Sequence, residues 1–177
     1  SANYQRREGW LQLISSHGPL SKNDRPTFVG RRQESPRMVA ETFINFDEGL
    51  PRDEAGMTVY QNHDGHADLF LRPSNDKTQV AVKMKLKNVE SIIATAVIDG
   101  YSAYLRIRSD GDNYWFDYSV DGKNYQTLTS VSCTLLSTEV LGGFTGAVIG
   151  LYAVENNFSE AYGRSFARFD YFDYLEQ

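Results

Sequence analysis

Four aromatic residues fall within five positions of one segment: Tyr114, Trp115, Phe116 and Tyr118. An aromatic ring can stack on the apolar face of a sugar, and it can also pack inside a protein core. Along a β-strand successive side chains point to opposite faces, so one such strand can do both. What these rings do therefore depends on how residues 113–120 pair with the neighbouring strand.

The dipeptide Asp110-Gly111 predicts a two-residue hairpin turn between residues 101–109 and this strand. In that register Ile107 faces Tyr114 and Leu105 faces Phe116. The two rings then join a row of aliphatic side chains. We expect most of the aromatic residues here to belong to the core, with Trp115 as the exception.

The other face of the hairpin gathers residue types that can bind a sugar: Trp115, Tyr104, Arg106 and Asp117. An indole covers the apolar face of a pyranose, while a carboxylate and a guanidinium bond adjacent hydroxyl groups. In the alternative, favoured interpretation, Arg106 merely lies on Trp115 in a cation–π contact. A turn at Asp121-Gly122 would place Leu128 opposite Trp115, which favours burial of the indole.

The segment His63-Asp64-Gly65-His66 carries potential metal ligands. A zinc site needs a third or fourth protein ligand, and His17 is the one further histidine in the chain. A turn rich in His and Asp is the favoured interpretation. No cofactor is expected, although calcium could bind at one of the Asp-Gly loops as a structural ion.

Catalytic signatures are not found in the sequence. Glycoside hydrolysis depends on the distance between two carboxyl groups. The sequence does not give the distances between its 23 acidic residues. There is no Gly-x-Ser-x-Gly elbow and no phosphate loop. The single cysteine, Cys133, lies in no nucleophile signature. We therefore predict no catalytic residue.

The elements that position these residues are strands. In residues 80–87 apolar side chains alternate with Lys, which predicts a strand with one buried face. Short strands separated by Asp-Gly and Asn-rich turns predict an all-β antiparallel sandwich, with one helical turn within 135–145. The predicted strands are 10–14, 27–32, 38–46, 55–61, 67–72, 80–87, 92–98, 101–109, 113–120, 127–131, 147–153 and 166–175.

The length and the net charge of the chain limit its number of domains and its partners. With 177 residues the chain fits one domain, expected over 1–177. A net charge of −5 argues against nucleic acid or an anionic membrane surface as partner. No apolar run is long enough for a membrane span, and no signal peptide is visible. The start at Ser1-Ala2-Asn3 fits a piece cut from a longer protein, and we expect the chain to be such a piece.

Seven segments, in order, resemble a known family. They are residues 9–13, 29–33, 39–42, 54–61, 116–122, 144–153 and 167–174. Together they resemble the C-terminal domain of β-xylosidases and arabinofuranosidases of glycoside hydrolase family 43. The resemblance extends over nearly the whole chain and implies a concanavalin A-like jelly roll of two curved antiparallel sheets.

The resemblance also implies a role. Such a domain follows a β-propeller catalytic domain, packs against it and carries no catalytic carboxylate. We expect an accessory domain that stabilises and shapes the pocket of a xylan- or arabinan-processing hydrolase, periplasmic or secreted rather than cytoplasmic. The alternative is an independent carbohydrate-binding module that holds xylo- or arabino-oligosaccharides on the concave sheet face.

Two further expectations concern the N-terminal third. In some family members a loop before the Arg-Arg-Gln strand places a Phe at the catalytic pocket, and the resemblance puts that position near Asp24. Asn23, Asp24 and Arg25 are instead expected at the seam between the domains. Arg31 and Arg32 alternate across their strand, and the one that points inward should pair with Glu41 in a structural ion pair.

Overall fold

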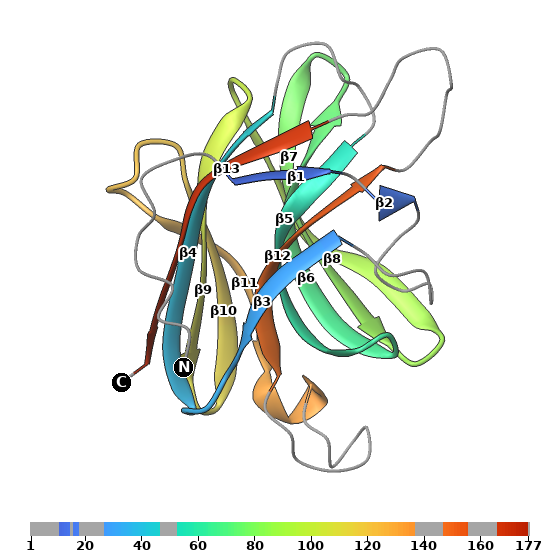
Figure 1. Ribbon diagram of the computed structural model, residues 1–177, viewed down its shortest axis with the longest axis vertical. Helices are drawn as coiled ribbons and strands as arrows, with labels where there is room; N and C mark the ends of the chain where they lie inside the picture. Colours follow the sequence, from blue (N-terminus) through green and yellow to red (C-terminus); the bar gives the residue numbers. More distant parts are fainter. Residues whose placement is uncertain are drawn as a thin grey trace.

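The computed structural model shows two β-sheets packed face to face (Figure 1). The structure describes residues 11–14, 16–17, 27–46, 53–136, 147–155 and 166–176. Nearly all of these residues lie in strands, as the alternation of apolar and polar residues predicts. The predicted all-β sandwich is confirmed.

One sheet has six strands. In spatial order they are β1 (Leu11–Ile14), β13 (Phe166–Glu176), β4 (Arg37–Phe46), β9 (Ser102–Asp110), β10 (Asn113–Ser119) and β11 (Gln126–Ser132). Every neighbouring pair in this sheet is antiparallel. Strands β4 and β9, far apart in sequence, lie side by side at its centre (Figure 1).

The other sheet has seven strands. The order is β2 (Ser16–His17), β12 (Val148–Glu155), β5 (Asp53–Asn62), β6 (Gly65–Ser74), β7 (Lys77–Leu86) and β8 (Val89–Ile98), and β3 (Thr27–Arg32) also pairs with β12. The pair of β2 with β12 is parallel. The two-residue β2 has no counterpart among the predicted strands. A 3-10 helix, η1 (Cys133–Leu136), follows β11.

The core lies between the sheets and follows the alternation of the sequence. Leu69 on β6 and Val82 on β7 face Leu105 and Ile107 on β9 and Phe116 on β10, and all five are fully buried. Burying a large apolar side chain contributes about 1.5–3 kcal/mol. Within the described residues, no helix is long and apolar enough to cross a membrane.

The register between β9 and β10 differs from the prediction by two residues. Ser109 pairs with Tyr114, and Ile107 pairs with Phe116, because the connecting turn is longer than Asp110-Gly111 alone. The Asp110 carboxylate accepts the backbone N–H groups of Asp112 and Asn113, at 2.9 and 2.8 Å, and holds the longer turn. An even shift keeps each side chain on its face, so the predicted burial of Tyr114 and Phe116 is confirmed.

The partners on the outer face nevertheless change. Arg106 lies opposite Asp117, and Arg108 lies opposite Trp115. The next turn is also longer than predicted, so Trp115 faces Ser130 and not Leu128. The prediction of these cross-strand partners was wrong, because turn length sets the register of a hairpin.

Strand β8 ends the order of the seven-stranded sheet and is mostly exposed. Its exposed apolar residues are Val89, Ile92, Ile93 and Val97. The register with β7 shifts between Val82 and Lys83, so Ile93 has no residue opposite it. The strand therefore carries a β-bulge near its middle.

Candidate functional site

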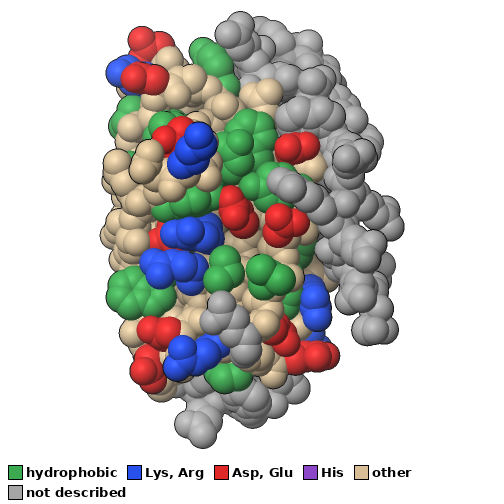
Figure 2. All heavy atoms as spheres, turned by 90° about the vertical axis from the view of Figure 1, so that its left-hand side faces the viewer, with side chains coloured by type: hydrophobic (Ala, Val, Ile, Leu, Met, Phe, Trp, Pro, Cys, Tyr) green, Lys and Arg blue, Asp and Glu red, His purple; other side chains and the backbone are tan. Residues whose placement is uncertain are grey.

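The four residues predicted to bind a sugar lie on the outer face of the six-stranded sheet. Figure 2 shows this side of the molecule, where basic, acidic and hydrophobic side chains lie close together. The register forms a row across the sheet in which Glu41 on β4 lies beside Arg106, Arg106 beside Asp117, and Asp117 beside Thr127 on β11. Trp115 and Arg108 occupy an adjacent row.

Asp117 is the centre of this row, and its side chain is fully buried. It accepts hydrogen bonds from Arg106 Nε at 2.9 Å, Arg108 Nε at 2.6 Å and Nη2 at 3.1 Å, and Thr127 Oγ1 at 2.7 Å. Burial alone would raise the pKa of Asp117, but the hydrogen bonds from Arg108, Thr127 and Arg106 lower it. The two carboxylate oxygens of Asp117 bond to other side chains of the chain and do not face solvent. Asp117 therefore does not bond a sugar directly.

The rings on this face are held by cations and by other rings. Arg108, and not Arg106, lies over Trp115, with its guanidinium carbon 5.6 Å from the ring centroid. The Trp115 indole N–H donates to Asp110 at 3.3 Å. Arg106 instead lies over Tyr125, at 3.9 Å. The predicted type of contact is present, but the register assigns it to different partners.

Tyr104 lies away from Trp115, beside Phe43 of β4, with 4.7 Å between ring centroids. It also covers Gly122, where an added Cβ atom would come within 2.8 Å of the Tyr104 ring. Gly122 has a φ of 74°, a conformation that glycine adopts without strain. The turn after β10 is therefore packed directly against the outer face of the sheet.

Glu41, which the sequence analysis paired with Arg31 or Arg32, has other partners on this face. Its carboxylate accepts hydrogen bonds from the hydroxyl groups of Tyr125 and Tyr171, the second at 3.1 Å. Tyr125 comes from the turn before β11 and Tyr171 from the irregular part of β13. One carboxylate thus joins three segments that lie far apart in sequence.

The predicted ion pair of Arg31 or Arg32 with Glu41 is corrected by the structure. Strand β3 pairs with β12 of the seven-stranded sheet, whereas Glu41 lies on β4 of the other sheet. Arg31 lies over the ring of Tyr174, 4.6 Å from its centroid, and Arg32 is exposed. The prediction failed because strands adjacent in sequence need not be adjacent in the sheet.

The tyrosines around Glu41 give the domain an expected alkaline sensitivity. Burial, together with the Glu41 carboxylate, raises the pKa of Tyr125 and Tyr171. The unfolded chain releases these protons near pH 10, before the folded one does, so stability is retained below about pH 10 and falls above it. Unfolding by urea between pH 8 and 11, with absorbance at 295 nm to follow ionisation, measures this. In the double variant Tyr125→Phe, Tyr171→Phe the fall should be smaller, and an unchanged fall would contradict the assignment.

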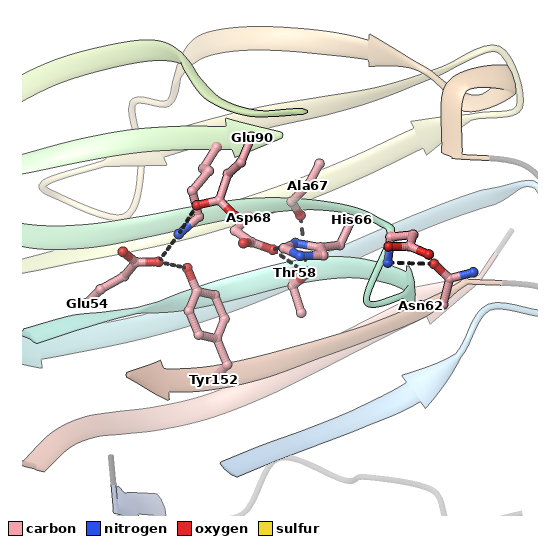
Figure 3. A network of polar contacts seen from close by, with 10 residues as sticks. Glu54, Thr58, Asn62, His66, Ala67, Asp68, Glu90 and Tyr152 are labelled. Atoms are coloured by element: carbon pink, nitrogen blue, oxygen red, sulfur yellow. Dashed lines mark hydrogen bonds and ion pairs between the residues drawn. The ribbon is translucent and has the colours of Figure 1, made fainter. Parts of the chain in front are cut away.

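A second polar cluster lies on the outer face of the seven-stranded sheet (Figure 3). Lys83 Nζ lies 2.8 Å from Glu54 Oε1, and the Tyr152 hydroxyl donates to the same oxygen at 2.9 Å. The side chains of Lys83 and Glu54 are 10% and 6% exposed, and Tyr152 is fully buried. Lys83 also lies 5.2 Å from the centroid of the Phe70 ring.

The alternation of residues 80–87 predicts one buried face, and Lys83 is buried although it lies on the opposite face of the strand. Alternation tells which face a residue occupies but not whether that face is covered. The sequence does hold one signal, because Phe70, Ala81 and Tyr152 are apolar residues on this same face and form a small cluster of their own. Close approach is also visible at Gly56, where an added Cβ atom would lie 2.0 Å from the Leu69 carbonyl oxygen.

His66 belongs to this buried face and not to a surface turn. Its Nδ1 lies 2.9 Å from Asp68 Oδ1, and the Thr58 hydroxyl donates to the same oxygen at 2.7 Å (Figure 3). His63 lies in the turn, as predicted, with its Nε2 3.5 Å from the Asp64 carboxylate. Within the described ranges no group of three His, Cys, Asp or Glu side chains is placed to hold a metal ion. Asn23, Asp24 and Arg25, predicted at a domain seam, lie outside the described residues.

The two facing sheets form a β-sandwich in which the chain passes from one sheet to the other, for example between β4 and β5. Residues 1–175 match the family model described as the beta xylosidase C-terminal concanavalin A-like domain. The chain belongs to this family. The resemblance inferred from the seven sequence segments is thereby confirmed.

Individual relatives agree with this assignment. The chain is 29% identical over 170 residues to the non-reducing end alpha-L-arabinofuranosidase BoGH43B of Bacteroides ovatus. The matched region covers 95% of this chain and 31% of the relative. It is 30% identical over 151 residues to a xylosidase/arabinosidase of Butyrivibrio fibrisolvens, covering 84% of this chain and 29% of that protein. The chain thus spans about a third of the length of the curated relatives it matches.

A solved structure shows the same fold. The Bacteroides ovatus xyloglucan PUL GH43B structure has a TM-score of 0.82 and 28% identity to this chain, covering 94% of it and 32% of the solved chain. In each of these proteins the similarity is confined to a minor part of the length. The fold described here is therefore one part of larger family 43 glycoside hydrolases.

Proposed function

We propose that the chain is the accessory domain of a family 43 glycoside hydrolase, which stabilises the catalytic β-propeller domain and helps to shape its pocket. The observation that carries the proposal is the match of residues 1–175 to a C-terminal domain, together with coverage of about a third of each relative. The relatives' names make xylan- or arabinan-type glycans the proposed substrates of the parent enzyme.

The positions of four acidic residues in the described part of the chain support a role without catalysis. Glycoside hydrolysis uses two carboxyl groups that flank the sugar and both reach it. Asp117, Glu54 and Asp68 are buried, and each is bonded to other side chains of the chain. Glu41 is bonded to two tyrosines. These carboxylates hold strands together, and we propose that the catalytic pair is supplied by the other domain.

Deletion of the domain from the parent enzyme tests this function. We expect the truncated enzyme to lose several degrees in Tm and at least tenfold in kcat/KM on an aryl xyloside or arabinofuranoside. The isolated chain should show no turnover of either substrate. As a control, the separate domain is added back to the truncated enzyme. Recovery of Tm and kcat/KM then shows a direct structural effect of the domain. Unchanged Tm and unchanged kcat/KM after deletion would refute the accessory role.

A further inference from the structure

The outer face of the six-stranded sheet carries five aromatic side chains that are each partly exposed. We name the set the aromatic face: Phe43, Tyr104, Trp115, Tyr125 and Tyr171. They come from β4, β9, β10, the turn before β11, and β13. On this side of the molecule Figure 2 shows hydrophobic side chains between basic and acidic ones. No packing inside the sandwich accounts for rings on this face, because the core lies on the opposite side of the sheet.

The charges of this face are largely balanced within it. Two guanidinium groups, Arg106 and Arg108, accompany the carboxylates of Asp117 and Glu41, and Asp117 bonds both guanidinium groups. Asp173 beside Glu41 adds one further acidic group. The face therefore offers rings and hydrogen-bonding groups with no excess of positive charge. That combination suits an uncharged ligand better than an acidic one.

The rings are also fixed before any ligand arrives. Arg106 lies on Tyr125, Arg108 on Trp115, and the Tyr125 and Tyr171 hydroxyls are bonded to Glu41. Side chains held in place in the free protein lose little conformational freedom on binding. These pre-positioned rings, together with the hydroxyl groups beside them and the guanidinium groups that lie against Tyr125 and Trp115, match the apolar faces and hydroxyl edges of a sugar chain.

We infer that the aromatic face binds a neutral oligosaccharide, with the rings as stacking surfaces and Glu41, Arg106 and the tyrosine hydroxyls as hydrogen-bonding groups. This site differs from the cluster predicted from sequence, because Asp117 is buried and supports the arginines from below. The inference goes beyond the accessory role, and either can hold without the other. Binding should be weak, with Kd on the order of 0.1 mM, as is expected for a shallow surface.

Calorimetric titration of the chain with xylohexaose and with arabinohexaose tests the inference. We expect at least one of them to bind, and the variants Trp115→Ala and Phe43→Ala to weaken that binding about tenfold. Tyr101→Ala removes an exposed ring outside the aromatic face and should leave Kd unchanged. Near-ultraviolet circular dichroism and Tm establish that each variant is folded.

Three results would overturn the inference. The first is the absence of binding of both sugars to the unaltered chain. The second is equal affinity of the unaltered chain, Trp115→Ala and Phe43→Ala. The third is tighter binding of an acidic oligogalacturonate than of the neutral sugars, because the balance of charge predicts the reverse. If sugars do not bind and Trp115→Ala lowers the Tm of the parent enzyme more than that of the isolated chain, the face belongs to the contact between domains.

Discussion

Replacing Lys83 with alanine is expected to lower the free energy of unfolding by about 3–5 kcal/mol. Glu54 would then carry its charge in a buried place without the ammonium group that now lies 2.8 Å away. Burial alone would lower the pKa of Lys83, but Glu54 and then Asp68 outweigh it and raise the pKa above 10.5. The contribution of this charge is therefore complete at neutral pH and is lost only as the pH rises above about 10.5.

Urea unfolding at pH 7 measures the effect, and the same strand offers the control. Lys77 pairs with Asp99 at 3.4 Å, but these side chains are 54% and 96% exposed. Lys77→Ala should change stability by no more than about 0.5 kcal/mol. The double variant Lys83→Met, Glu54→Leu should lose less than the single variant, because no unpaired charge stays buried. Equal losses for Lys83→Ala and Lys77→Ala would show that the buried pair stabilises the fold no more than the exposed pair does.

Asp117→Asn is expected to cost about 2–4 kcal/mol at pH 7. The substitution keeps the shape of the side chain but removes the charge that holds Arg106 and Arg108 over the sheet. Because the pKa of Asp117 is lowered below 3.8 by folding, its contribution is present above that pH and is lost as the pH falls further. The difference between the two proteins should thus be constant from about pH 5 to 8 and shrink below about pH 4.

Unfolding by urea across that pH range provides the measurement. Asp112→Asn, in the exposed turn of the same hairpin, serves as the matched control and should change stability little. If the Asp117→Asn difference persisted undiminished at pH 2, the effect would come from the amide and not from the lost charge. A second consequence is that Trp115, which lies under Arg108, should change its fluorescence in this variant.

The sequence predicted the face of the sheet on which each residue lies. It predicted the cross-strand partners of these residues less well. Tyr114 and Phe116 are in the core as expected, because period two survives an error of two residues in the register. The partners of Trp115 and Arg106 were wrong, because both turns contain more residues than their Asp-Gly dipeptides indicate. Side-chain hydrogen bonds such as those accepted by Asp110 set the turn, and dipeptide statistics do not include them.

Long-range contacts were the part that could not be predicted. Glu41 bonds to Tyr125 and Tyr171, 84 and 130 positions away, and no local pattern couples residues at such distances. Lys83 looks like any lysine on an alternating strand, and its burial depends on whether the outer face of the sheet is covered. Periodicity describes one strand at a time, whereas these two clusters arise from the order of strands in the sheets.

The bulge in β8 has a consequence for the solubility of the molecule. An open strand edge with several exposed apolar residues can act as a template on which strands of other molecules add. Within β8 only Glu90 is charged, which is weak protection for a ten-residue strand. The extra residue Ile93 puts the two halves of the strand out of step, so an added strand cannot form one continuous ladder. A single irregular residue thereby hinders growth of the sheet from molecule to molecule into a fibril.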